Sequence, residues 1–145
     1  MAPEAALDPK SALERAVLLH SVGDVQRAVE RMASEIAARL AGVNPVVLAV
    51  MHGGVFTAVE LCKRFRFPHE FDYVHVTRYR GGTLGGEIEW RVRPSSRLEG
   101  RTVLVVDDIL DRGHTLAALN AELDALQIAA RYAAALVVKL SLIHI

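Results

Sequence analysis

Three short apolar runs constrain the fold of this chain most, because none of them alternates with polar residues. They cover Val46–Val50, residues 102–106 and residues 133–138. A strand with one solvent-facing side shows such an alternation, whereas a strand covered on both faces of a parallel sheet does not. The first two runs therefore predict buried strands of a parallel sheet, and the third predicts the final strand. Residues 71–78, rich in aromatic and β-branched side chains, predict one more strand.

Segments with a helical period separate these strands. In residues 25–40 apolar residues recur every three or four positions, as on one face of an amphipathic helix; they are Val25, Val29, Met32, Ile36 and Leu40. Two more helices are predicted over residues 55–64 and 115–127. The alternation predicts a single α/β domain over residues 1–145. Its open, mostly parallel sheet is flanked by helices and binds ligands beyond the carboxyl ends of the strands.

Length and composition exclude several classes of protein. The 145 residues suffice for one hydrophobic core, and 17 basic residues balance 17 acidic ones, which disfavours a nucleic-acid-binding protein. No apolar stretch approaches the ~20 residues that span a bilayer. The charged residues among positions 1–20 are unlike a secretory signal, so we expect a cytoplasmic protein. Cys62 is the one cysteine, so a disulfide framework is excluded and we expect a buried apolar role for it.

A glycine-rich segment lies between Tyr79 and Trp90. It contains Gly81, Gly82, Gly85 and Gly86 and few apolar anchors. We expect a mobile loop that folds over a ligand. The alternative is a plain surface hairpin.

The most informative segment for function is residues 103–115, which read VLVVDDILDRGHT. A buried strand delivers Asp107 and Asp108 to its carboxyl end. The following turn, with Gly113 and Thr115 at a helix start, aims backbone N–H groups at a phosphate. Adjacent carboxylates accept hydrogen bonds from the hydroxyls of a ribose or help to hold magnesium. Together these features predict a site for a phosphorylated sugar.

Two alternatives compete with this interpretation. An Asp-Asp pair after a strand also serves in helix capping and turns. The same string is similar to the acidic pocket of response-regulator receiver domains. In those domains the pair lies near the start, whereas 37 residues follow Asp108 here.

The whole string resembles the phosphoribosyl pyrophosphate signature of type I phosphoribosyltransferases. Four further segments resemble the hypoxanthine-guanine branch of that family, in order: 50–54, 77–81, 85–87 and 137–139. The similarity extends over roughly residues 20 to 139. It implies a Rossmann-like sheet with a flexible active-site loop, and transfer of the phosphoribosyl group to hypoxanthine or guanine, giving IMP or GMP and pyrophosphate.

The resemblance also implies roles for the acids and the turn. Asp107 and Asp108 would face the ribose hydroxyls and the Mg²⁺-bound sugar. The catalytic residue would be Asp111, which lies beside the purine imidazole ring and either accepts its proton or orients the ring. The 5′-phosphate would be wrapped by Asp111, Arg112, Gly113, His114 and Thr115. Arg112 and His114 occupy variable places of the motif, where the backbone matters more than the side chain.

Three more segments receive roles from the same resemblance. His52, Gly53 and Gly54 match the pyrophosphate loop, with Met51–His52 as the expected cis peptide bond; a simple strand-to-helix turn is the alternative. Tyr79 matches the loop tyrosine that covers the reaction centre. Lys139 matches the lysine that donates to the 6-oxo group, where otherwise a solvated side chain is expected.

The resemblance stops near Lys139. Members of the family continue with another strand, an aromatic residue that stacks on the purine, and an acid. We therefore expect that the C-terminal part of the domain is missing after about residue 139. The family also implies a homo-oligomer, whereas the balanced charge and the short apolar stretches predict neither nucleic-acid nor membrane binding. The competing hypothesis is a phosphoribosyl-pyrophosphate-sensing regulator of the same fold that binds RNA or DNA; the zero net charge disfavours it.

Overall fold

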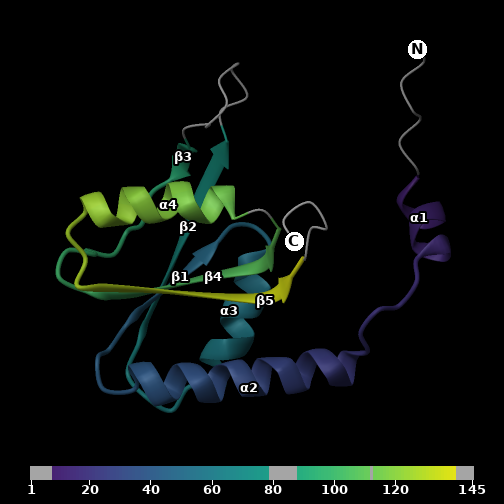
Figure 1. The fold of residues 1–145 in the computed structure, drawn as a ribbon, viewed down its shortest axis with the longest axis horizontal. Coiled ribbons are helices and arrows are strands. Elements are labelled where there is room, and N and C mark those ends of the chain that lie inside the picture. The colour runs from purple at the N-terminus through teal and green to yellow at the C-terminus, as the bar shows by residue number, and fades with distance from the viewer. Residues whose placement is uncertain (1–7, 79–87, 112, 140–145) are drawn as a thin grey trace, which may run out of the picture.

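A five-stranded sheet forms the centre of the protein in the computed structural model, which describes residues 8–78, 88–111 and 113–139. The strand order is β3-β2-β1-β4-β5 (Figure 1). Four strands run parallel: β1 (Val46–Val50), β2 (Glu70–Arg78), β4 (Thr102–Leu110) and β5 (Ala130–Val138). β3 (Ile88–Val92) pairs antiparallel with β2 at one edge. The predicted open, mostly parallel sheet is confirmed.

Helices cover both faces of this sheet. Helix α4 (His114–Ala125) lies on one face, and α2 (Val22–Leu40) and α3 (Gly54–Cys62) lie on the other, as Figure 1 shows. Each face has its own apolar cluster. Alternate residues of β1 point to opposite clusters, Val47 and Ala49 toward α2 and α3, and Val46 and Leu48 toward α4. This is why the sequence of β1 is apolar throughout.

The long helix α2 begins where the sequence supplies a capping box. The Ser21 side chain accepts a hydrogen bond from the Asp24 backbone N–H, and the Asp24 carboxylate accepts one from the Ser21 N–H. This cap starts the helix three residues before Val25, the predicted start. Val29, Ile36 and Leu40 are buried, as the helical period predicts, whereas Val25 is 38% exposed near the free end.

The apolar runs differ in their burial. β1 is buried throughout, and so are the residues of β4 from Val103 to Val106, as predicted. The last run, in β5, is largely half-buried or exposed. The predicted final strand is therefore present as β5, but it is less buried than β1 and the centre of β4. Within the described residues this strand is at the sheet edge and pairs with β4 alone.

The acidic segment is more regular than the sequence predicts. The apolar run that predicts this strand ends at residue 106, but β4 continues to Leu110 because β5 pairs with it as far as Leu110↔Val138. The turn before α4 is correspondingly short. Cys62 is half-buried, and this burial raises the pKa of its thiol to about 11.

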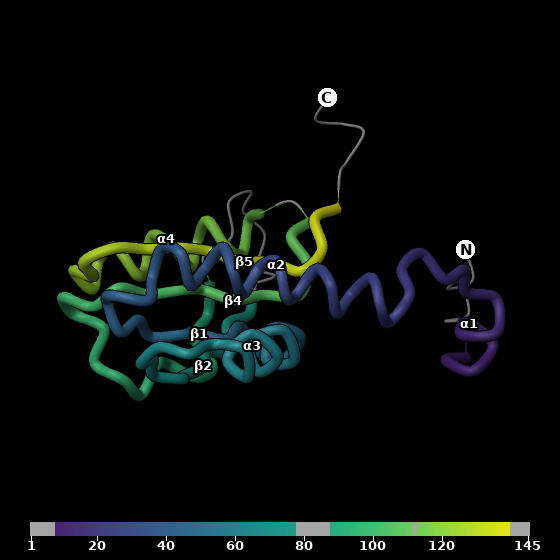
Figure 2. Tube along the Cα trace, turned by 90° about the horizontal axis from the view of Figure 1, so that it is seen from below, coloured from purple at the N-terminus to yellow at the C-terminus, as the bar shows by residue number. Residues whose placement is uncertain are grey.

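Two elements of the structure, α1 and β3, were not predicted from the sequence. The short helix α1 (Pro9–Arg15) carries no buried residue and stands clear of the body of the protein (Figure 2). The strand β3 lies where a loop was expected, although the alternation of Ile88, Trp90 and Val92 with Glu89 and Arg91 is a strand signal. The rest of the expected mobile loop, residues 79–87, is outside the described residues. No described helix is long and apolar enough to cross a membrane.

Candidate functional site

A cavity of about 360 Å³ opens at the carboxyl ends of β1 and β4, where the sequence places the candidate site. Most of the predicted residues meet there. The lining includes Gly53, Asp107, Asp108, Asp111, Gly113, His114 and Thr115. Apolar walls from Val50, Met51, Val76 and Leu116 complete it. These wall residues were not predicted; their place at strand ends and in the first turn of α4 is the signal that points to them.

The two acids at the end of β4 are fixed by their own backbone. The Asp108 N–H donates to Oδ1 of Asp107 at 2.9 Å, and the Ile109 N–H donates to Oδ1 of Asp108 at 2.8 Å. Burial acts to raise the pKa of Asp107, the backbone hydrogen bond from Asp108 acts to lower it, and the Asp108 carboxylate acts to raise it, so that the resulting pKa is about 6. The pair is therefore a compact, partly desolvated acceptor for hydroxyl groups or a cation.

The loop after β1 packs directly against these acids. A Cβ atom on Gly53 would lie 2.2 Å from Oδ2 of Asp108, and one on Gly54 would lie 2.4 Å from the carbonyl oxygen of Val106. The peptide bond between Met51 and His52 is cis, as the resemblance implies. Glycine at positions 53 and 54 thus allows the loop backbone to reach the end of β4, which no larger residue permits.

His52 is the residue of this loop before Gly53, and its side chain is exposed. Its ring contacts the ring of His75 edge to face, with 4.6 Å between the ring centroids. His75 belongs to β2, whose next residue, Val76, lines the cavity. Because neighbouring strand residues point to opposite faces, the His75 ring lies on the other face of the sheet. Of the loop after β1, Met51 and Gly53 line the cavity and His52 does not.

The turn before α4 has the geometry that the sequence predicts for phosphate binding. Gly113 adopts a positive φ of 74° and caps α4, whose first residues are His114 and Thr115. The first N–H groups of a helix lack partners within the helix, and the helix dipole favours an anion there. Gly113, His114 and Thr115 all line the cavity, whereas Arg112 lies outside the described residues.

Lys139 follows β5 and comes close to Asp111. Its Nζ lies 3.9 Å from Oδ2 of Asp111, and its backbone N–H donates to the Leu110 carbonyl at 2.9 Å. Both side chains are at least half exposed, so this ion pair contributes little to stability. It places a cation beside Asp111, which lines the cavity, although Lys139 itself is not among the lining residues. Tyr79, the remaining predicted site residue, is outside the described residues.

Comparison with known proteins agrees with this geometry. Residues 19–141 match the family described as the phosphoribosyl transferase domain. The chain belongs to this family. Among similar curated phosphoribosyltransferases, the hypoxanthine-guanine-xanthine enzyme of Tritrichomonas foetus is 35% identical over 104 residues, 72% of this chain. The hypoxanthine-guanine enzyme of Streptococcus agalactiae is 33% identical over 100 residues, 68% of this chain.

These alignments cover 56% of each relative, so the chain spans just over half the length of the phosphoribosyltransferases it matches. The fold is also similar to that of solved phosphoribosyltransferase structures. A solved structure of hypoxanthine phosphoribosyltransferase from Staphylococcus aureus superposes with a TM-score of 0.81 at 23% identity, covering 91% of this chain and 73% of the other. The sheet and flanking helices are thus those of the phosphoribosyltransferase fold.

Proposed function

We propose that the protein is a purine-salvage enzyme, a 6-oxopurine phosphoribosyltransferase. It transfers the phosphoribosyl group of phosphoribosyl pyrophosphate to hypoxanthine or guanine, giving IMP or GMP and pyrophosphate. The observation that carries this proposal is the placement of the Lys139–Asp111 pair beside the two acids of β4. The cavity then has one part for a sugar phosphate and an adjacent part for a base.

The sugar-phosphate part follows from the donors and acceptors at the cavity. The amide groups of Gly113, His114 and Thr115 bind the 5′-phosphate at the start of α4. Asp107 and Asp108 accept hydrogen bonds from the ribose hydroxyls. The backbone of His52, Gly53 and Gly54 binds the pyrophosphate, since this loop packs against Asp108.

The base part is selective because it combines a donor with an acceptor. Hypoxanthine and guanine present a 6-oxo acceptor next to an imidazole N–H. Lys139 donates to the oxygen and Asp111 accepts from the N–H, and the 3.9 Å between these side chains suits neighbouring groups on one purine edge. Adenine presents a 6-amino donor toward the lysine instead, so its binding is disfavoured.

The reaction is governed by charge and position. Departure of pyrophosphate leaves an oxocarbenium-like anomeric carbon, which the purine nitrogen attacks from the opposite face. The loop amides stabilise the leaving group. Asp111 holds the imidazole ring by a hydrogen bond, with its carboxylate where the ring loses a proton. Tyr79 covers the reaction centre in this proposal.

Mg²⁺ is the metal ion that this donor set fits. Asp107 and Asp108 are hard oxygen ligands, and the described residues contain no cluster of three or more potential ligands. Magnesium is commonly held by one or two carboxylates together with substrate oxygens. When bound, it neutralises charge on the pyrophosphate. Asp107 and Asp108 would hold it through the sugar substrate.

The proposal includes a cytoplasmic location and a homo-oligomeric state, both of which fit a salvage enzyme acting on small molecules. The alternative, a nucleic-acid-binding regulator, receives no support from the relatives, whose names are those of enzymes. The equal numbers of acidic and basic residues also give it no electrostatic basis.

Nucleotide formation tests the proposal. The chain, extended at its C-terminus through the purine-stacking segment that the family implies after residue 139, is incubated with phosphoribosyl pyrophosphate and magnesium and with hypoxanthine, guanine or adenine in turn, and products are separated by chromatography. We expect IMP and GMP and little AMP. Calorimetric titration with phosphoribosyl pyrophosphate is the companion measurement. Binding of the sugar without conversion of any base would contradict an enzyme, and preferential conversion of adenine would contradict the roles of Lys139 and Asp111.

A further inference from the structure

The charges of the candidate cavity do not match the substrate that it is proposed to bind. Its lining holds three carboxylates, those of Asp107, Asp108 and Asp111, and no lysine or arginine among the described residues. The proposed substrate is itself an anion, with a 5′-phosphate and a pyrophosphate. His114 is the one described lining residue whose side chain can carry a positive charge.

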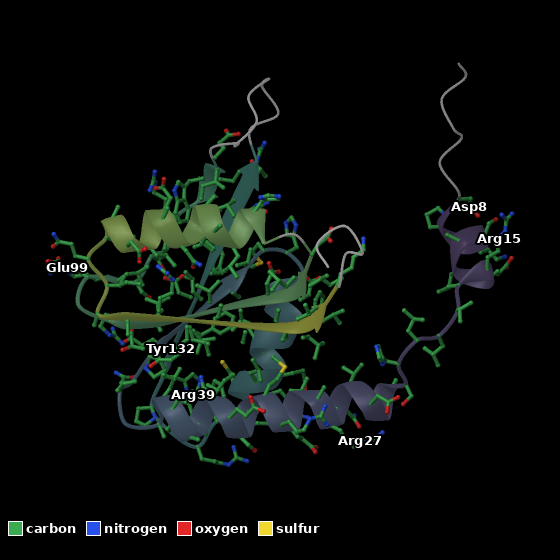
Figure 3. All side chains as sticks on the ribbon, in the orientation of Figure 1. Asp8, Arg15, Arg27, Arg39, Glu99 and Tyr132 are labelled. Carbon is green, nitrogen blue, oxygen red and sulfur yellow. The ribbon has the colours of Figure 1, made fainter. Side chains whose placement is uncertain are left out.

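Basic residues elsewhere in the described chain do not supply this charge. Figure 3 labels Arg15 on α1 and Arg27 and Arg39 on α2, and α2 covers the opposite face of the sheet from α4. Lys139 lies 3.9 Å from Asp111, in the part of the cavity proposed for the base. The part proposed for the 5′-phosphate therefore depends on backbone amides and on whatever His114 adds.

The side chain of His114 is well placed for this role. His114 is the first residue of α4 and directly follows the turn at Gly113, whose amide groups are proposed to bind the 5′-phosphate. It is exposed and lines the cavity. None of the ion pairs among the described residues includes it. The ring can therefore turn toward a bound phosphate without breaking an ion pair.

Charges of both signs act on the His114 imidazole. The positive end of the α4 dipole disfavours a cation on the first residue of the helix, and Lys139 acts in the same direction. The carboxylates of Asp107, Asp108 and Asp111 in the same cavity favour a cation. A phosphate bound at the start of α4 adds negative charge next to the ring. Phosphate binding and the positive charge of His114 therefore favour each other.

We propose that the protonated imidazole of His114 binds the 5′-phosphate through its side chain, so that the affinity for the sugar phosphate depends on pH. This inference rests on the proposed function, which places the phosphate at this turn, but the family motif gives position 114 only a backbone role. A hydrogen bond from an imidazolium to a phosphate oxygen is charge-assisted and stronger than one from a neutral donor. Because histidine changes its charge between pH 5 and 8, this contact forms and is lost near physiological pH.

Calorimetric titration with ribose 5-phosphate tests this inference without the transfer reaction, because this probe carries the phosphate but neither pyrophosphate nor base. His114→Gln keeps the backbone amide and a neutral donor. We expect the parent to bind about fivefold or more tightly than His114→Gln at pH 6, and the two to differ by less than about twofold at pH 8. The phosphate and Asp107, whose pKa is about 6, also titrate in this range. Both are present in each protein, so the ratio of the two affinities reports His114.

His114→Lys keeps a positive charge at pH 8 and should bind the probe about fivefold more tightly than the parent there. His20→Gln is the matched control, because His20 is exposed before α2 and is not part of the cavity lining. It should keep the pH dependence of the parent, and circular dichroism verifies folding of each variant.

Two results would overturn the inference and leave the sugar-phosphate site intact. One is the same ratio of parent to His114→Gln affinity at both pH values, and the other is a lysine variant that binds no more tightly than the parent at pH 8. If the parent did not bind ribose 5-phosphate at either pH, the sugar-phosphate site itself would be contradicted, and this inference with it. Failure of base conversion alone would contradict the proposed enzyme and leave the role of His114 standing.

Discussion

Gly53 and Asp108, 55 positions apart in the sequence, are so close that a Cβ atom on Gly53 would lie 2.2 Å from Oδ2 and 2.5 Å from Cγ of Asp108. The loop after β1 and the end of β4 therefore form one unit. Asp108 has little room to yield, because its Oδ1 accepts the Ile109 N–H at 2.8 Å. This contact makes glycine necessary at position 53 for the site rather than for the core.

Gly53→Ala should therefore damage ligand binding more than stability. The added methyl group displaces the Asp108 carboxylate, and we expect affinity for phosphoribosyl pyrophosphate with magnesium to fall by about tenfold or more, which corresponds to ~1.4 kcal/mol. Calorimetric titration measures it. Gly42→Ala is the control, since a Cβ there meets nothing within 4 Å. Equal affinities for the two variants would contradict the close contact.

Gly54→Ala should instead destabilise the fold. Its Cβ would meet backbone atoms, the Val106 carbonyl oxygen at 2.4 Å and the Asp107 Cα at 3.1 Å, which cannot rotate away. We expect a loss of about 2–4 kcal/mol in the free energy of unfolding. Urea denaturation compared with Gly42→Ala measures it. A smaller loss of unfolding free energy than that of Gly53→Ala would show that the backbone at the start of α3 can shift to accommodate the added methyl group.

Asp107→Asn should stabilise the protein near neutral pH. Burial raises the folded-state pKa of Asp107 to about 6, so its stability contribution is complete below the unfolded pKa near 4 and is lost as the pH rises through 6. We expect a gain of about 1 kcal/mol at pH 8, allowing for solvent screening, and none at pH 4. Thermal or urea unfolding at the two pH values measures it. A gain that does not depend on pH would exclude titration of Asp107 as its cause.

Asp72→Asn should have the opposite pH dependence. This carboxylate is 3% exposed and accepts hydrogen bonds from the N–H groups of Ser96 and Tyr73, at 2.6 and 2.7 Å, and from the Ser95 hydroxyl. Burial acts to raise its pKa, but these hydrogen bonds together lower it. The variant should lose about 2–3 kcal/mol at pH 7.

Because the folded pKa of Asp72 lies below the unfolded value near 4, its stabilisation is present above pH 4 and is lost as the pH falls through the folded value. Urea denaturation at pH 7 and pH 3 should show the difference between parent and variant shrinking at the lower pH. Ser95→Ala, which removes one of the donors, should cost about 1 kcal/mol. A constant difference would mean that the charge of Asp72 is not what stabilises the segment after β3.

Asp111→Asn should separate chemistry from sugar binding. The carboxylate that faces Lys139 is lost, while the amide groups at the start of α4 remain. In the chain extended through the C-terminal segment that the family implies, we expect turnover with hypoxanthine to fall about 10²-fold or more and affinity for phosphoribosyl pyrophosphate to stay within about twofold. Steady-state rates and calorimetric titration measure the two. Turnover close to that of the parent would exclude Asp111 as the group that handles the imidazole proton.

The sequence alone determined the α/β class, the central strands and the string from Val103 to Thr115. Burial on both faces leaves β1 and β4 continuously apolar, and this local pattern can be read without contacts. The turn at Gly113 can also be predicted from the local sequence, because its positive φ favours glycine. The candidate residues that share this segment were therefore predicted together from the sequence.

What only the tertiary structure decided depends on pairing between distant segments. β4 extends through Asp107 and Asp108 because β5 pairs with it there. The apolar run of β5 is exposed although its sequence resembles those of the buried strands, because β5 lies at the edge of the described sheet. The contacts of Gly53 with Asp108 and of Asp111 with Lys139 join residues far apart along the chain. No local pattern encodes them, because side-chain periodicity specifies which face of an element is buried and not which element it meets.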